Sequence, residues 1–180
     1  MTEAEFSLSL VRARLEPLFV VAPEVWMRHW SGEKIRIDYV ASPREGSGVP
    51  DGIYGFEIKK DPAGFKDTSG AYAQAIDYQG SVIDDLRKPP IPGLWNGQRL
   101  RYTFVAQPWC WQTGCKAEWD SGAFAGVIRL AGKFGVGLVT VGRYSGLSLY
   151  VGPEPIWKEN DGARSGIESW HTRNSVGHRS

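Results

Sequence analysis

The stretch Tyr54-Gly55-Phe56-Glu57-Ile58-Lys59-Lys60 decides how this chain is interpreted, because it predicts a strand that carries charge in an apolar frame. Side chains two residues apart in a strand share a face, so Glu57 and Lys59 point the same way. Charged groups rarely lie unpaired among buried neighbours. We therefore interpret this pair as part of a site and not as ordinary core.

A second acidic residue lies upstream, because Arg36-Ile37-Asp38-Tyr39-Val40 also predicts a strand. Between the two strands, residues 42–52 contain two prolines, three glycines and two serines, the composition of a hairpin loop. A hairpin makes the two strands antiparallel neighbours. We therefore expect Asp38 and Glu57 to come together, with Lys59 beside them.

Length and composition indicate a folded, water-soluble protein. The chain has 180 residues, 42% of them hydrophobic, and a net charge of +1. We expect one domain over residues 1–157 and a polar, weakly ordered tail over 158–180. No apolar run approaches the roughly 18 residues that cross a bilayer, and the first residues lack the basic start of a secretory signal. A cytoplasmic location is the expectation.

The hydrophobic pattern predicts helices and strands in an alternating order. The expected helices span residues 2–19, 71–86 and 122–134. The expected strands lie in 20–30 and at about 34–41, 53–60, 99–106, 136–141 and 147–151. This order predicts an α/β (α+β) fold with a central mixed β-sheet flanked by helices.

The order of elements, with acids on the second and third strands, resembles the PD-(D/E)xK nuclease superfamily. The matching pieces are Asp38, the triplet Glu57-Ile58-Lys59, and Gln74 in the helix that follows. The resemblance covers roughly residues 1–150. It implies a restriction-endonuclease-like core and a small nuclease of phage or prophage type that hydrolyses phosphodiester bonds in DNA.

The resemblance also implies a metal site and a role for each matching residue. Mg²⁺, or Mn²⁺ in its place, takes oxygen ligands. Asp38, Glu57 and the backbone carbonyl of Ile58 would supply them. Lys59 would orient the attacking water or stabilise charge, and Gln74 would position the lysine or the water.

Further residues are candidates for the same site. Many members of the family use a glutamate of the first helix, for which Glu5 and Glu16 are both suitable, and Tyr78 lies one helical turn after Gln74. Asp51 follows Pro50 and spells the "PD" of the family name. It belongs to the turn end of the same strand as Glu57, so Asp38 is preferred as the first acid.

Other interpretations stay open at this stage. Glu57 and Lys59 could form an ion pair on a solvated sheet face, in a domain that is not a nuclease. A catalytically inactive protein that binds nucleic acid or serves in assembly could also keep the fold. The choice between DNA and RNA, and whether the chain forms a homodimer, are not decided by the sequence.

Two other clusters stand out in the sequence. Cys110 and Cys115 flank a short loop and predict a reduced pair, with a disulfide that closes the loop as the alternative. Two cysteines alone do not make a zinc site. The second cluster is a tryptophan-rich segment, whose rings serve either as core anchors or as platforms for base stacking. Its members are Trp109, Trp111 and Trp119.

Overall fold

The computed structural model describes residues 2–59, 65–85, 94, 96–107, 122–142, 146–152 and 154–159. The helices are α1 (Glu3–Leu10), a π-helical turn η1 (Val11–Leu15), α2 (Phe65–Gln79) and α4 (Gly122–Gly132). The strands are β1 (Phe19–His29), β2 (Lys34–Pro43), β3 (Tyr54–Ile58), β4 (Ser81–Ile83), β5 (Tyr102–Ala106), β6 (Val136–Gly142), β7 (Gly146–Val151) and β8 (Glu154–Lys158).

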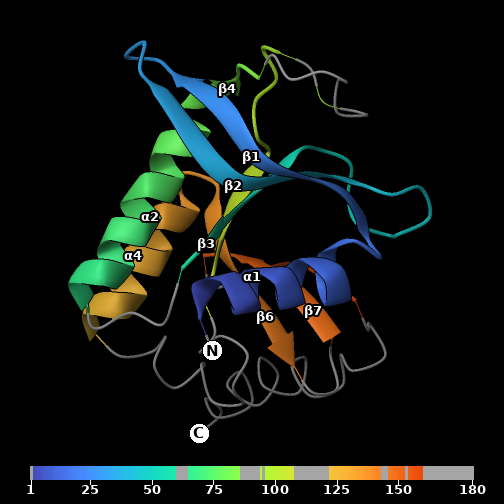
Figure 1. Cartoon of the computed structure of the whole chain (residues 1–180). Coiled ribbons are helices and arrows are strands. Elements are labelled where there is room, and N and C mark those ends of the chain that lie inside the picture. Colours follow the sequence, from blue (N-terminus) through green and yellow to red (C-terminus); the bar gives the residue numbers. More distant parts are fainter. Residues whose placement is uncertain are drawn as a thin grey trace, which may run out of the picture.

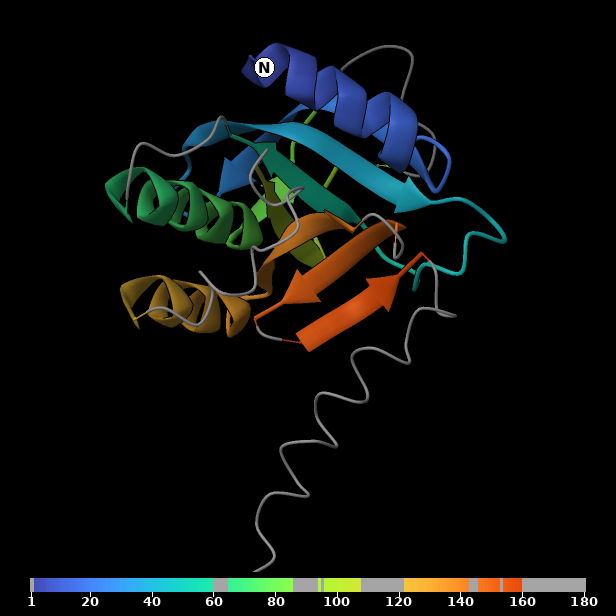
Figure 2. The same ribbon diagram turned by 90° about the horizontal axis from the view of Figure 1, so that it is seen from below.

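The strands form one eight-stranded sheet in the order β4-β1-β2-β3-β5-β6-β7-β8. Most neighbours are antiparallel, whereas β3, β5 and β6 run parallel in its centre. Helix α1 lies on one face of the sheet, and α2 and α4 lie side by side on the other (Figures 1 and 2). The predicted α+β fold with a mixed sheet and flanking helices is confirmed.

The two faces of the sheet carry separate hydrophobic cores. Under α1, Phe6 and Leu10 pack with aromatic side chains of the central strands, among them Phe56 and Phe104. Under α2 and α4, Tyr72 and other helical residues pack on the opposite face of β5 and β6. Strand β3 follows this division: Phe56 and Ile58 belong to the α1 side, so Glu57 between them faces α2.

The expected helix over 71–86 is wrong at both ends. Helix α2 begins at Phe65 and ends at Gln79, and residues 81–83 form β4 against β1. Gly80 follows the helix, and Ser81 Oγ donates a 2.7 Å hydrogen bond to the carbonyl of Asp77. The β-branched Val82 and Ile83 then pair with Arg28 and Met27. Pairing with a distant strand thus overrides a locally helical pattern.

The first helix is shorter than the expected 2–19. Helix α1 and η1 end at Leu15. Pro17 follows two residues later and has no backbone N–H with which to continue the helical hydrogen bonds. Toward the other end of the chain, the structure has a strand that was not expected, β8. This strand includes Lys158, the first residue of the expected tail. Residues 160–180, the rest of the expected tail, lie outside the described residues. Among the described helices, none has the length and apolar character to cross a membrane.

Candidate active site

The hairpin between β2 and β3 brings the two predicted acids together. The antiparallel register pairs Tyr39 with Phe56, so the next pair outward is Asp38 with Glu57. Oδ2 of Asp38 accepts a 2.7 Å hydrogen bond from the backbone N–H of Ile58. This bond fixes the Asp38 carboxylate against the end of β3. The hairpin loop predicted from the sequence accounts for this juxtaposition.

Glu57 is the buried member of the acid pair. Its side chain is 2% exposed, and Lys59 Nζ lies 2.6 Å from Oε1. The second oxygen, Oε2, is buried and has no hydrogen-bond partner within the described part of the chain. A buried carboxylate oxygen without a partner is unfavourable, because it has lost its hydration without replacement. The geometry therefore leaves one ligand atom open to a cation.

The electrostatics of the pair agree with this geometry. Burial raises the pKa of Glu57, and the negative charge of Asp38 raises it further, against the opposing effects of Lys59 and the nearby Tyr78 hydroxyl. Burial also raises the pKa of Asp38, and the Ile58 N–H and Lys59 oppose it. Two carboxylates held close and partly dry repel each other. A divalent cation between them would relieve that repulsion.

Helix α2 reaches the acid pair through a buried tyrosine. The Tyr78 hydroxyl donates a 2.8 Å hydrogen bond to the carbonyl of Arg36 and accepts a 2.7 Å bond from Nε2 of Gln74. Burial, and then the charge of Glu57, raise the pKa of the Tyr78 hydroxyl, so it stays protonated. Gln74 is exposed, and its described side-chain hydrogen bond goes to Tyr78 and not to Lys59. The predicted role of Gln74 in positioning Lys59 is therefore indirect at most.

The first-helix glutamates are placed differently from the expectation. Glu5 closes a capping box: its Oε2 accepts a 2.7 Å bond from the N–H of Thr2, whose hydroxyl caps the Glu5 N–H. Glu16 follows η1, where its carbonyl accepts a bond from Arg44. The glutamate whose charge acts on Asp38 is Glu3, and this charge raises the pKa of Asp38.

Sequence reasoning missed Glu3, although a signal existed. The pattern Thr2-x-x-Glu5 already assigns the Glu5 side chain to the helix N-terminus. The remaining acid of the first turn was then Glu3.

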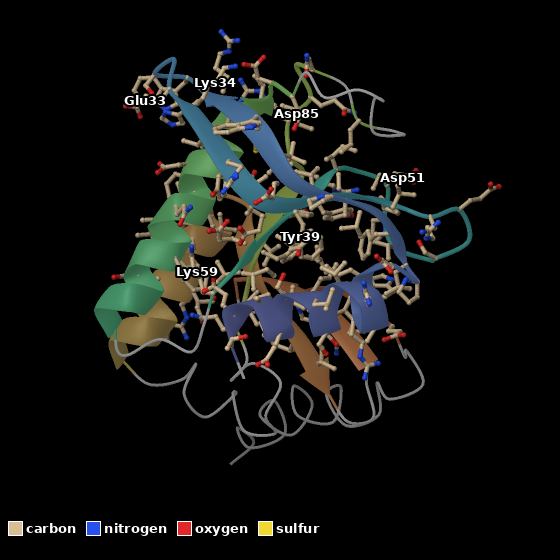
Figure 3. All side chains as sticks on the ribbon, viewed as in Figure 1. Glu33, Lys34, Tyr39, Asp51, Lys59 and Asp85 are labelled. Atoms are coloured by element: carbon tan, nitrogen blue, oxygen red, sulfur yellow. The ribbon has the colours of Figure 1, made fainter. Side chains whose placement is uncertain are left out.

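Asp51 lies at the opposite end of β3 from Glu57, in the turn before the strand. Its carbonyl accepts a hydrogen bond from the Arg101 guanidinium, and Gly52 beside it has a φ of 146°. Figure 3 shows Asp51 and Lys59 well apart in the molecule. The preference for Asp38 over Asp51 as partner of Glu57 agrees with this placement.

In the part of the chain that the structure describes, no group of three or more histidine, cysteine, aspartate and glutamate side chains is arranged to hold a metal ion. The acid pair would therefore need further oxygen ligands, such as the Ile58 carbonyl, water or substrate. Cys110, Cys115 and the tryptophans 109, 111 and 119 lie outside the described residues.

Comparison with protein-family models, curated proteins and solved structures finds no match to this chain.

Proposed function

We propose that this protein is a metal-dependent nuclease of the PD-(D/E)xK type that hydrolyses phosphodiester bonds in DNA. The observation that carries the proposal is the buried Glu57 carboxylate, with one oxygen bonded to Lys59 and the other without a partner, directly beside Asp38. A stable fold gains little from two neighbouring carboxylates in a partly dry place. A cation site, in contrast, uses both carboxylates as ligands.

The fold supports the same proposal. The chain runs through a helix, three antiparallel strands, a second helix and the short strand β4 before it returns as β5, parallel to β3. The acids lie at the carboxyl end of β3, in the centre of the sheet. We propose that this arrangement is a restriction-endonuclease-like core. The phage or prophage origin, the homodimer and the cytoplasmic location stay predictions.

The residues present fit Mg²⁺ or Mn²⁺. Asp38, Glu57 and the Ile58 carbonyl offer the hard oxygen ligands that these ions take, and the open Oε2 of Glu57 is the observation that favours a bound cation. When bound, such an ion would lower the pKa of a water and stabilise negative charge on a phosphate. Glu3 is the first-helix acid best placed to act on Asp38.

The other residues of the site have roles that follow from their contacts. The Lys59 ammonium contacts Glu57 and is 31% exposed, so it can also donate to a phosphate oxygen or to an attacking water. Tyr78 ties α2 to the backbone of β2 next to Asp38 and lies beside Glu57. Gln74 supports Tyr78 from the exposed side of the helix. Lys59 is therefore the catalytic residue proposed here, and Gln74 and Tyr78 are positioning residues.

A second candidate is a catalytically inactive nuclease-fold protein that binds nucleic acid or serves in assembly. One observation favours it: an oxygen of Asp38 and an oxygen of Glu57 are already bonded, to the Ile58 N–H and to Lys59. The interpretation as an ion pair on a solvated sheet face fits less well, because Glu57 is buried and pairs with Lys59, the residue directly after its own strand.

Cleavage assays separate the two candidates. Supercoiled, linear, single-stranded and branched DNA are incubated with the protein in Mg²⁺ or Mn²⁺, with EDTA as the metal-free control. We expect cleavage by wild type and a loss of at least about 100-fold in Lys59→Ala, since a positioned acid or base contributes about 10²–10⁴-fold. Lys133→Ala, which removes an exposed lysine after α4, is the matched control. Cleavage of none of these DNAs would favour the inactive binding protein.

A further inference from the structure

The outer face of the β1–β2 hairpin carries a second set of groups suited to nucleic acid. The register pairs Trp26 with Arg36 and Arg28 with Lys34. Residues two apart in a strand share a face, so these two cross-strand pairs lie next to each other. We call these four side chains the hairpin face. Lys34 lies near the tip of the hairpin (Figure 3).

The hairpin face is open, whereas the other side of the same strands is core. Val25, Met27 and Ile37 are buried under α2. Trp26 is 44% exposed, and the guanidinium of Arg36 lies 5.8 Å from the centre of its ring. The guanidinium lies over the ring, where a cation–π interaction attracts the two groups. The result is a half-exposed aromatic ring in contact with a positive charge.

The three cations of the hairpin face are held in place but remain accessible. Asp84 accepts from Arg28 at 2.6 Å and lies 3.3 Å from Lys34 Nζ, so one carboxylate positions two cations. Arg36 contacts Glu24 at 3.4 Å. All three cationic side chains are about half exposed. Asp84 and Glu24 contact these cations, and the Asp85 carboxylate accepts a 3.1 Å hydrogen bond from the Trp26 N–H, so three positive charges stand beside three carboxylates.

A ligand that uses this face needs a flat apolar ring and negative charges a few ångströms away. A nucleotide with an unpaired base has both, because its base can stack on an aromatic ring while its phosphates meet lysine and arginine. A base within a duplex has no open face for Trp26. The combination of ring and cations therefore favours a single strand over a duplex.

We propose that the hairpin face binds single-stranded nucleic acid, with an unpaired base stacked on Trp26 and phosphates near Arg28, Lys34 and Arg36. The inference deepens the proposed function, on which it rests for the position of the cleaved bond. Along β2, Asp38 is two residues from Arg36 and four from Lys34, about 7 and 13 Å at the strand rise. These are distances along the backbone of β2: Glu57 faces α2, whereas the hairpin face lies on the opposite side of the sheet.

The test is binding in EDTA, where no cleavage occurs. Fluorescence anisotropy is measured with labelled oligo-deoxythymidine, oligo-uridine and a blunt DNA duplex of the same length. We expect wild type to bind the single strands more tightly than the duplex, and Trp26→Ala to weaken single-strand binding at least about fivefold. Trp26→Phe keeps a ring and should retain most of the affinity. Arg36→Ala should lower the slope of log affinity against log salt by about 0.7.

Arg101→Ala is the matched control, because Arg101 also lies over an aromatic ring, that of Tyr102, away from the hairpin face. It should bind as wild type does. Circular dichroism and the melting temperature report whether each variant folds. The affinities for oligo-deoxythymidine and oligo-uridine show whether the hairpin face prefers single-stranded DNA or single-stranded RNA.

The outcomes separate this inference from the nuclease proposal. Equal binding by wild type, Trp26→Ala and Arg36→Ala would overturn the hairpin face even if wild type cleaves DNA. Weakened binding by both variants would support it even if no DNA is cleaved. If wild type binds no nucleic acid, the inference is wrong, and an acidic protein segment is the class of ligand that the same groups would fit.

Discussion

At the scale of single residues, Glu57 is the residue that both the sequence pattern and the structure single out. The carboxylate is buried beside Asp38, and both burial and that neighbour raise the pKa of Glu57. A carboxyl whose pKa is higher in the folded than in the unfolded chain binds more protons when folded. The free energy of unfolding therefore falls as the pH rises from the unfolded pKa to the folded one, and it stays lower above that.

We expect Glu57→Gln to stabilise the metal-free protein, because the amide removes a buried charge. At about pH 7.5 in EDTA the free energy of unfolding should rise by about 1–2 kcal/mol. Since 1 kcal/mol corresponds to about 2–4 °C for a chain of this size, the melting temperature reports the change. The gain should shrink toward zero as the pH falls to about 3, below the unfolded pKa of about 4.3, where the carboxyl is protonated in both states.

The matched control is Glu45→Gln, which changes an exposed glutamate in the β2–β3 loop and should leave the melting temperature unchanged. A lower stability of Glu57→Gln at neutral pH would mean that the bond to Lys59 outweighs the cost of burial. The site would then be a stable ion pair and not a strained one.

At the scale of elements, close backbone approach distinguishes the glycines. A Cβ on Gly137 in β6 would lie 1.7 Å from the carbonyl oxygen of Tyr150 in β7, and no side-chain movement relieves a backbone clash. A Cβ on Gly126 in α4 would meet nothing within 4 Å. The two positions therefore predict opposite effects of the same substitution.

We expect Gly137→Ala to destabilise the protein by about 3 kcal/mol or more, because β6 and β7 must separate to admit the methyl group. Gly126→Ala should stabilise it by about 0.5–1 kcal/mol, since alanine loses less backbone entropy in a helix. Urea unfolding measures both. A Gly137→Ala protein as stable as wild type would contradict the tight pairing of these strands.

Most elements were predictable from local pattern, and the exceptions are short strands. The alternation of β3, the loop before it and the helical spacing of α2 and α4 are local properties of the chain. Strands β4 and β8 were missed because each has few residues and lies at an edge of the sheet. Pro155 also weakens the strand pattern of β8, although an edge strand tolerates proline. Their existence depends on partners far away in the chain.

At the scale of the whole molecule, a bound cation should stabilise the complete fold. Asp38 and Glu57 come from neighbouring central strands, which are adjacent only in the folded chain. A ligand that binds only the folded state raises the free energy of unfolding, by about 1.4 kcal/mol at ten times its dissociation constant. We therefore expect Mg²⁺ or Mn²⁺ to raise the melting temperature of wild type by a few degrees, at about 2–4 °C per kcal/mol.

Asp38→Asn should abolish this shift, because it removes one of the two carboxylates. Glu5→Gln should leave the shift unchanged, since the Glu5 side chain caps α1. The titration is followed by differential scanning fluorimetry with EDTA as the reference. A metal-induced shift that persists in Asp38→Asn would place the cation elsewhere.

The sequence by itself determined the hairpin that pairs Asp38 with Glu57, because strand alternation and loop composition are local. Only the tertiary structure decided the rest of the site. The burial of Glu57 and its open oxygen, the contact of Tyr78 with the Arg36 carbonyl, and the effect of the Glu3 charge on Asp38 all depend on how distant elements pack. Arg36 and Tyr78 are 42 residues apart in the chain. Local propensity carries no information about such contacts, which form only when helix and sheet bury their apolar faces together.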